Sequence, residues 1–224
     1  MNQLLTTLLA LSVAGATNLA FAQEAPATQA SPKSLQAKVA MCVGCHGIVG
    51  YQASFPQVYK VPKIAGQNAK YIAAALHAYK TGDRKHPSMQ SIADGLTEQD
   101  IADISVYYQD LGKADRKPLA DKPSREPDAK VAALLQKAAC ASCHGANFSK
   151  PLDPSYPKIA GQHSDYLFVA LKAYKAENNP DFGRSNGIMG AIAKQFSNNE
   201  LKAIARYVSS LDTEIETKAE PKFR

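Results

Sequence analysis

The sequence AMCVGCHG, at residues 40–47, places a histidine directly after a pair of cysteines. The same order returns at residues 139–145 as ACASCHG, and these two stretches contain all four cysteines of the chain. The arrangement C-x-x-C-H is therefore present twice, and whatever chemistry it serves is duplicated.

The repetition extends well beyond the cysteines. The six residues PKIAGQ at 62–67 recur letter for letter at 157–162. Further matching pairs follow in the same order along the chain: Tyr71 and Tyr166, Leu76 and Leu171, Arg84 and Arg184, Met89 and Met189, Leu111 and Leu211. Solenoid repeats have periods of roughly 20–50 residues, so this longer period indicates the duplication of a whole domain.

Helix signals occur at corresponding places in the two copies. We predict helix starts at Ser31-Pro32, Asn68 and Thr97 in the first copy and at Ser197, with Glu200 completing a capping box, in the second. No stretch has the two-residue period of a strand. The sequence therefore predicts an all-α fold of two tandem domains.

The first residues of the chain have a different character from the rest. Residues 1–22 carry no charge and end in Ala20-Phe21-Ala22, the pattern of a signal-peptide cleavage site. The competing reading is an uncleaved membrane anchor, but polar residues interrupt the apolar run. We therefore expect export to the periplasm and a soluble mature protein. The expected organisation is a signal peptide (1–22), a flexible leader (23–30), a first domain (31–113), a Pro- and charge-rich linker (114–130), a second domain (131–212) and a polar tail (213–224).

Composition excludes few functions. The chain of 224 residues is 45% hydrophobic and 21% charged, which is ordinary for a globular protein. Its net charge of +6 comes from basic residues that are scattered among 20 acids, so no basic patch indicates nucleic acid.

Four explanations of the cysteines compete. Disulfides are usual in an exported chain, a redox-active C-x-x-C occurs in a βαβ context, and a structural zinc site pairs its C-x-x-C knuckles at short spacing. None of these three needs the histidine. C-x-x-C-H is the attachment signature of c-type haem, in which two thiols one helical turn apart form thioethers and the histidine binds iron. We therefore predict two covalent haem c groups, held by Cys42, Cys45, His46, Cys140, Cys143 and His144.

A second axial ligand is expected from a methionine in each copy. Met89 and Met189 lie at similar distances after the haem histidines, in stretches predicted to be loops before the last helix. A methionine that merely fills a core gap is the alternative. The matched positions favour ligation of both irons, and a thioether raises the reduction potential.

Other residues are weaker candidates. The carbonyls of Pro62 and Pro157 are expected to accept a hydrogen bond from the haem histidines, although a rigid turn without such a bond remains open. Cationic side chains at Tyr79-Lys80, Tyr174-Lys175, Arg84 and Arg184 would lie near haem propionates or form solvated helix ends. His77, His86 and His163 lack a histidine in the other copy, and we predict packing or surface roles for them, although His86 lies close enough to Met89 to compete for iron.

Two copies of C-x-x-C-H-G, P-K-I-A-G-Q, Y-K and M resemble the dihaem class I cytochromes of the cytochrome c4 family. The resemblance spans nearly the whole chain after residue 22. It implies two cytochrome c domains related by a pseudo-twofold axis, with facing haem edges. It also implies an electron carrier rather than an enzyme, at most loosely associated with a membrane, that accepts electrons from a donor such as a quinol-oxidising complex and delivers them toward a terminal oxidase.

Two other functions remain open at this stage. One is a cytochrome subunit of a larger dehydrogenase complex, for example of the flavocytochrome type, because such subunits share the tandem domains. The other is a dihaem peroxidase, which would need an open sixth position on one iron. A methionine in both copies argues against the peroxidase.

Overall fold

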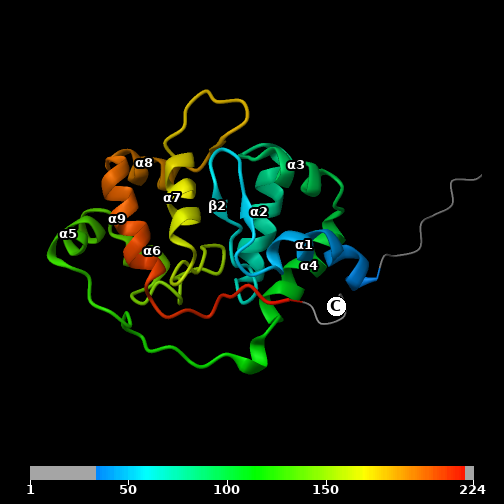
Figure 1. Ribbon diagram of the computed structural model, residues 1–224, viewed down its shortest axis with the longest axis horizontal. Coiled ribbons are helices and arrows are strands. Elements are labelled where there is room, and N and C mark those ends of the chain that lie inside the picture. Colours follow the sequence, from blue (N-terminus) through cyan, green and yellow to red (C-terminus); the bar gives the residue numbers. More distant parts are fainter. Residues whose placement is uncertain (1–33, 220–224) are drawn as a thin grey trace, which may run out of the picture. The chain divides into compact units, whose positions relative to one another are not determined.

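The computed structural model describes residues 34–219. The expected signal peptide, the expected leader and the start of the first predicted helix lie outside this range. Helices dominate the described residues, and the strands among them are only two residues long (Figure 1). We call the part from α1 (Leu35–His46) to α4 (Glu98–Asp110) the first repeat and the part from α5 (Ala129–Lys137) to α9 (Asn198–Ser209) the second repeat.

The first repeat begins with the helix that carries the first cysteine pair. Its elements are α1 (Leu35–His46), β1 (Gln52–Ala53), β2 (Tyr59–Lys60), α2 (Ala69–Thr81), β3 (Arg84–Lys85), α3 (Pro87–Asp94) and α4 (Glu98–Asp110), followed by the 3-10 turn η1 (Lys113–Asp115). The second repeat consists of α5 (Ala129–Lys137), α6 (Cys140–His144), α7 (Ser164–Ala173), β4 (Gly183–Arg184), α8 (Gly187–Lys194) and α9 (Asn198–Ser209).

Local capping explains most of the helix starts. Ser197 forms the predicted capping box with Glu200, and Thr97, which was predicted only as a helix start, forms one with Asp100. Asn68 precedes α2, but its side chain makes no capping bond there. Helix α1 begins after Ser34, whose hydroxyl accepts a hydrogen bond from Ala37 N–H.

Each repeat has its own apolar core. In the first repeat α2 packs against α4, and their buried side chains include Ile72, Leu76 and Ile104. In the second repeat α7 and α9 pack in the same way around Leu167 and Leu201. Because the two cores share no residue, each copy of the duplicated sequence forms its own domain.

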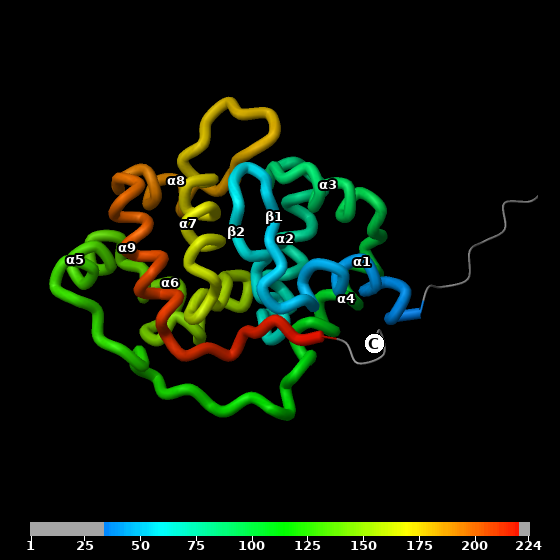
Figure 2. Tube along the Cα trace, in the orientation of Figure 1, coloured from blue at the N-terminus to red at the C-terminus, as the bar shows by residue number. Residues whose placement is uncertain are grey.

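The short strands have different roles. β1 and β2 form an antiparallel hairpin within the first repeat, which Figure 2 shows as two adjacent tubes. β3 pairs with β4 of the second repeat, with Arg84 opposite Arg184. No sequence periodicity marks these pairs, because a two-residue strand is too short to show one.

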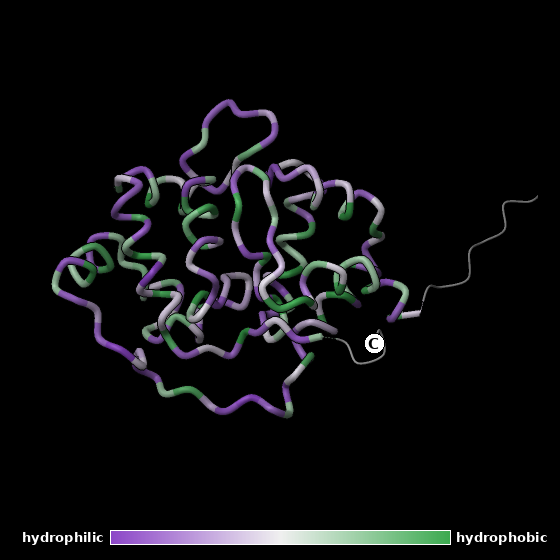
Figure 3. The backbone as a smooth tube through the Cα atoms, viewed as in Figure 1, coloured by the Kyte–Doolittle hydropathy of each residue, from purple (hydrophilic) through white to green (hydrophobic). Residues whose placement is uncertain are grey.

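Two irregular segments connect the repeats. The linker between η1 and α5 has no regular secondary structure, and Figure 3 shows that hydrophilic residues predominate along it. The second segment, residues 213–219, was expected to be part of a polar tail. Instead Ile215 is 1% exposed, and Glu216 N–H donates to Ala65 O of the first repeat at 3.0 Å. We call residues 213–219 the C-terminal strap.

No helix among residues 34–219 combines the length and the apolar character that a membrane span requires.

Candidate haem sites

The first C-x-x-C-H motif lies at the end of α1. Cys42 and Cys45 are one turn apart on this helix, and both side chains are half-buried, with Cys42 against the first core. Burial raises the pKa of the Cys42 thiol to about 11. Redox-active cysteines and zinc ligands need a lowered thiol pKa, so this environment is the opposite of the one they require.

The second motif has the same residues on a differently built helix. α5 ends at Lys137, Ala139 adopts a left-handed conformation with φ 48°, and the separate short helix α6 carries Cys140, Cys143 and His144. The second copy thus breaks the helix that is continuous in the first copy. Burial likewise raises the pKa of Cys140 to about 11.

The alternative explanations of the cysteines fail in this structure. All four cysteines are free, so the disulfides are absent. Within the described part of the chain, no group of three or more His, Cys, Asp or Glu side chains is arranged to hold a metal ion. Half-buried thiols, of which Cys42 and Cys140 pack against the two apolar cores, suit thioether formation with a porphyrin.

A backbone carbonyl orients each motif histidine. Nδ1 of His46 lies 2.8 Å from Pro62 O, and Nδ1 of His144 lies 3.0 Å from Pro157 O. A carbonyl can only accept, so Nδ1 carries the proton and Nε2 keeps its lone pair. Burial lowers the pKa of both histidines, which keeps the rings neutral. Nε2 of each ring is therefore the nitrogen available to an iron.

The two methionines lie on short helices rather than in the predicted loops. Met89 is the third residue of α3 and Met189 is the third residue of α8, and both side chains are half-buried. The expectation of loops was wrong because the cap signals were overlooked. His86 caps α3 ahead of Pro87, and Asn186 caps α8.

The His86 ring is already engaged by protein groups. Its Nδ1 accepts a hydrogen bond from Met89 N–H at 3.3 Å, so Nε2 carries the proton and donates to the Tyr59 hydroxyl at 2.9 Å. Neither nitrogen is left to compete for an iron. His77 pairs with Glu98 at 3.3 Å, and His163 stands at the N-cap position of α7.

The cations that recur in both repeats separate into two groups. Lys80 and Lys175 donate to the carbonyls of Leu96 and Phe196, which precede the last helix of each repeat, both at 2.7 Å. Lys80 is exposed at the end of α2, as a solvated helix end would be, whereas Lys175 is half-buried, and each ties the end of one helix to the start of the last helix of its repeat.

Arg84 and Arg184 are the cations that remain at the site. The Arg84 guanidinium donates to the Tyr71 hydroxyl at 3.2 Å, and that of Arg184 donates to the Tyr166 hydroxyl at 3.1 Å. Both guanidinium groups also lie over tyrosine rings. Among the described ion pairs neither has a carboxylate partner. Two half-buried cations on adjacent strands would therefore suit the carboxylates of haem propionates.

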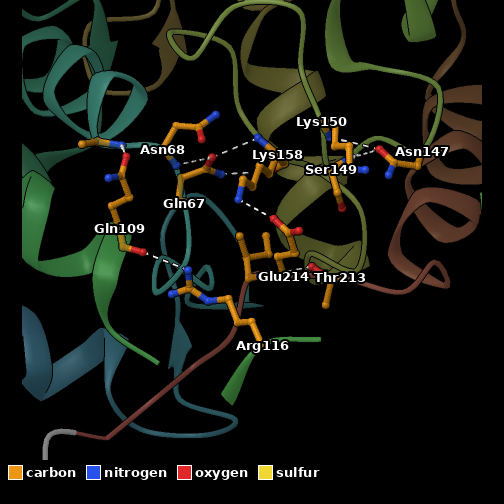
Figure 4. A network of polar contacts seen from close by, with 12 residues as sticks. Gln67, Asn68, Gln109, Arg116, Asn147, Ser149, Lys150, Lys158, Thr213 and Glu214 are labelled. Carbon is orange, nitrogen blue, oxygen red and sulfur yellow. Dashed lines mark hydrogen bonds and ion pairs between the residues drawn. The ribbon is translucent and has the colours of Figure 1, made fainter. Parts of the chain in front are cut away.

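Sequence reasoning overlooked two polar residues. Gln67 and Gln162 end the repeated PKIAGQ segments and are only 3% and 5% exposed. Each bonds to the backbone of the other repeat, and Figure 4 shows Gln67 reaching Lys158. Their letter-for-letter recurrence was the available signal, but no sequence feature indicated a partner in the other copy.

Comparison with known proteins identifies the family to which both repeats are similar. A family model for cytochrome c matches residues 35–112 and again residues 129–212. Cytochrome c4 of Pseudomonas aeruginosa is 31% identical over 215 residues, which cover 94% of this chain and 100% of that protein. A thiosulfate dehydrogenase electron acceptor of Stutzerimonas stutzeri is 27% identical over 76% of this chain and 78% of its own length. The structure of cytochrome c4 from Acidithiobacillus ferrooxidans aligns with a TM-score of 0.55 at 25% identity, covering 77% of this chain and 99% of that one.

Proposed function

Because the chain belongs to the cytochrome c family and is a cytochrome c4-like electron-transfer protein with two covalently bound haem c groups, we propose how its residues hold the irons. His46 and Met89 would hold the first iron. His144 and Met189 would hold the second iron. Cys42, Cys45, Cys140 and Cys143 form the thioether bonds.

One observation carries this proposal: the proline carbonyls make Nε2 the lone-pair nitrogen of both histidines. The hydrogen bond holds each ring in one orientation, so Nε2 can bind an iron without rotation of the imidazole. The haem supplies a one-electron couple between Fe(II) and Fe(III). Met89 and Met189 lie in the first turns of helices capped by His86 and Asn186, which restrict the positions of their thioethers. A soft thioether favours Fe(II), so we expect both reduction potentials to be high.

The same ligand set in both repeats favours a carrier over an enzyme. A peroxidase would need one iron with an open or displaceable sixth position, whereas each repeat supplies a methionine. We propose that the protein works in the periplasm after cleavage of residues 1–22, and that it passes single electrons from a quinol-oxidising complex toward a terminal oxidase.

The absorption spectrum of the oxidised holoprotein tests the ligands. We expect a weak methionine–iron charge-transfer band at the red end that integrates to two haems. Met89→Ala and Met189→Ala should each remove half of it. The matched control is Met41→Ala, because Met41 is 68% exposed and stands outside the proposed ligand set, and this variant should keep the whole band. Rapid carbon monoxide binding to the reduced wild-type protein would contradict the proposal and favour an enzyme with an open site.

A second candidate function is to accept electrons from one dedicated dehydrogenase. It is favoured by the relative described as a thiosulfate dehydrogenase electron acceptor. The two functions differ in the electron donor. Purified thiosulfate dehydrogenase with thiosulfate should reduce this protein much faster than a quinol-oxidising complex does if the second candidate is right, and much more slowly if the first is right.

A further inference from the structure

Two buried glutamines connect the repeats in a reciprocal way. Gln162 of the second repeat accepts a hydrogen bond from Lys63 N–H at 3.0 Å and donates to Lys63 O at 2.9 Å. Gln67 of the first repeat accepts from Lys158 N–H at 2.9 Å and donates to Lys158 O at 2.9 Å (Figure 4). Each side-chain amide thus pairs with the backbone of the opposite repeat as a neighbouring strand would.

The backbone N–H that each glutamine binds belongs to a particular peptide group. Lys63 N–H is part of the same peptide as Pro62 C=O, and this carbonyl accepts the hydrogen bond of His46 Nδ1 at 2.8 Å. The second repeat has the same chain of contacts, with Lys158 N–H, Pro157 C=O and His144 Nδ1 at 3.0 Å. One planar peptide therefore separates each glutamine from the haem histidine of the other repeat.

Resonance couples the two ends of a peptide group. When its N–H donates a hydrogen bond, the carbonyl oxygen becomes more negative and accepts more strongly, an effect of roughly 10–30% per bond. A stronger bond at Nδ1 increases electron density on the imidazole, and this favours Fe(III) over Fe(II) at Nε2. Gln162 should therefore act on the ligand in the first repeat, and Gln67 on the ligand in the second.

We propose that Gln67 and Gln162 are positioning residues that tune the haem of the opposite repeat through the peptides Pro157–Lys158 and Pro62–Lys63. This inference rests on the proposed ligation by His46 and His144. It makes the two reduction potentials depend on contact between the repeats. A change in that contact, such as one caused by a docked partner, alters both hydrogen-bond chains together.

The test is a pair of substitutions in the full-length holoprotein, Gln162→Leu and Gln67→Leu. Spectroelectrochemistry gives the two midpoint potentials, and the axial-methionine signals of the NMR spectrum assign each to a haem. Gln162→Leu should raise the potential of the first haem, the one in the other repeat. A change of about threefold in the Fe(II)/Fe(III) ratio corresponds to about 28 mV at 59 mV per tenfold. Gln67→Leu should do the same to the second haem.

A glutamine that merely holds the repeats together would not give this crossed pattern. The control is Asn68→Leu, which removes the bond from the Asn68 side chain to Tyr156 O, a contact between the repeats that lies outside the Pro62–Lys63 and Pro157–Lys158 peptides. It should leave both potentials unchanged. Equal shifts of both haems, or a shift of the haem in the mutated repeat, would overturn the proposal.

A second readout is independent of electron transfer. The Nδ1–H proton of His46 in the reduced protein should move upfield in Gln162→Leu, while that of His144 should stay in place. If Gln162→Leu fails to fold, Gln162→Asn breaks the same bond because its shorter side chain cannot reach Lys63 N–H. Failure of the proposed ligation would appear in the wild type as a missing methionine–iron band. Failure of the relay alone would leave that band intact and give no crossed shift.

Discussion

Replacing Ile215 with alanine should show how much the C-terminal strap stabilises the protein. The Ile215 side chain is 1% exposed, although the strap lies outside the helices and strands. Ile→Ala removes three carbon groups at about 0.8 kcal/mol each, and a cavity term adds to this. We expect a loss of about 3 kcal/mol in the free energy of unfolding. For a chain of this size, that corresponds to a fall in Tm of about 6–12 °C.

Thermal and urea unfolding of the oxidised holoprotein, followed by far-UV circular dichroism, measures this loss. Leu152→Ala is the control because Leu152 is 80% exposed, and its effect should stay within about 0.5 kcal/mol. The reasoning fails if Ile215→Ala is no more destabilising than Leu152→Ala. That result would mean that the strap detaches without disturbing either core.

Four further predictions concern single residues. Gly161→Ala should destabilise by about 2–5 kcal/mol in urea unfolding, because φ is +64° and a Cβ would lie 2.5 Å from the Thr213 side chain. Gly44→Ala should instead stabilise by about 0.5–1 kcal/mol in the same assay, because Gly44 lies inside α1 and, apart from the neighbouring backbone of that helix, no described residue lies within 4 Å of the added Cβ. Hydrogen bonds from Thr97 lower the pKa of Asp100 from 3.8 to about 2. This carboxylate therefore stabilises the protein above about pH 4, and the stabilisation disappears as the pH falls toward 2. Asp100→Asn should flatten the curve of unfolding free energy against pH in that window. Arg184→Gln should lower both midpoint potentials in spectroelectrochemistry, because it removes a cation that opposes the extra positive charge of Fe(III). Unchanged potentials would show that the Arg184 guanidinium lies away from the haems.

Local signals allowed much of the fold to be predicted. The capping box at Ser197 is formed by residues three apart, so the sequence predicts it and the structure contains it, and the helix start predicted at Thr97 is also confirmed. The loops expected around the methionines were wrong, although Pro87 after His86 is a helix-start signal of the same local kind. The left-handed Ala139, which divides the helix of the second copy, has no such signal.

The candidate sites likewise contain some features that the sequence predicts and others that only the tertiary structure decides. The spacing of cysteine and histidine predicts haem attachment because the porphyrin itself dictates that spacing, and the duplication predicts two domains. The partners of Gln67 and Gln162, the pairing of β3 with β4 and the course of the strap join residues about 90 or more positions apart. Such contacts depend on how the two folded domains pack against each other. The amino-acid order therefore determines which residues can bind a haem, whereas packing between the repeats decides which side chain reaches which haem histidine.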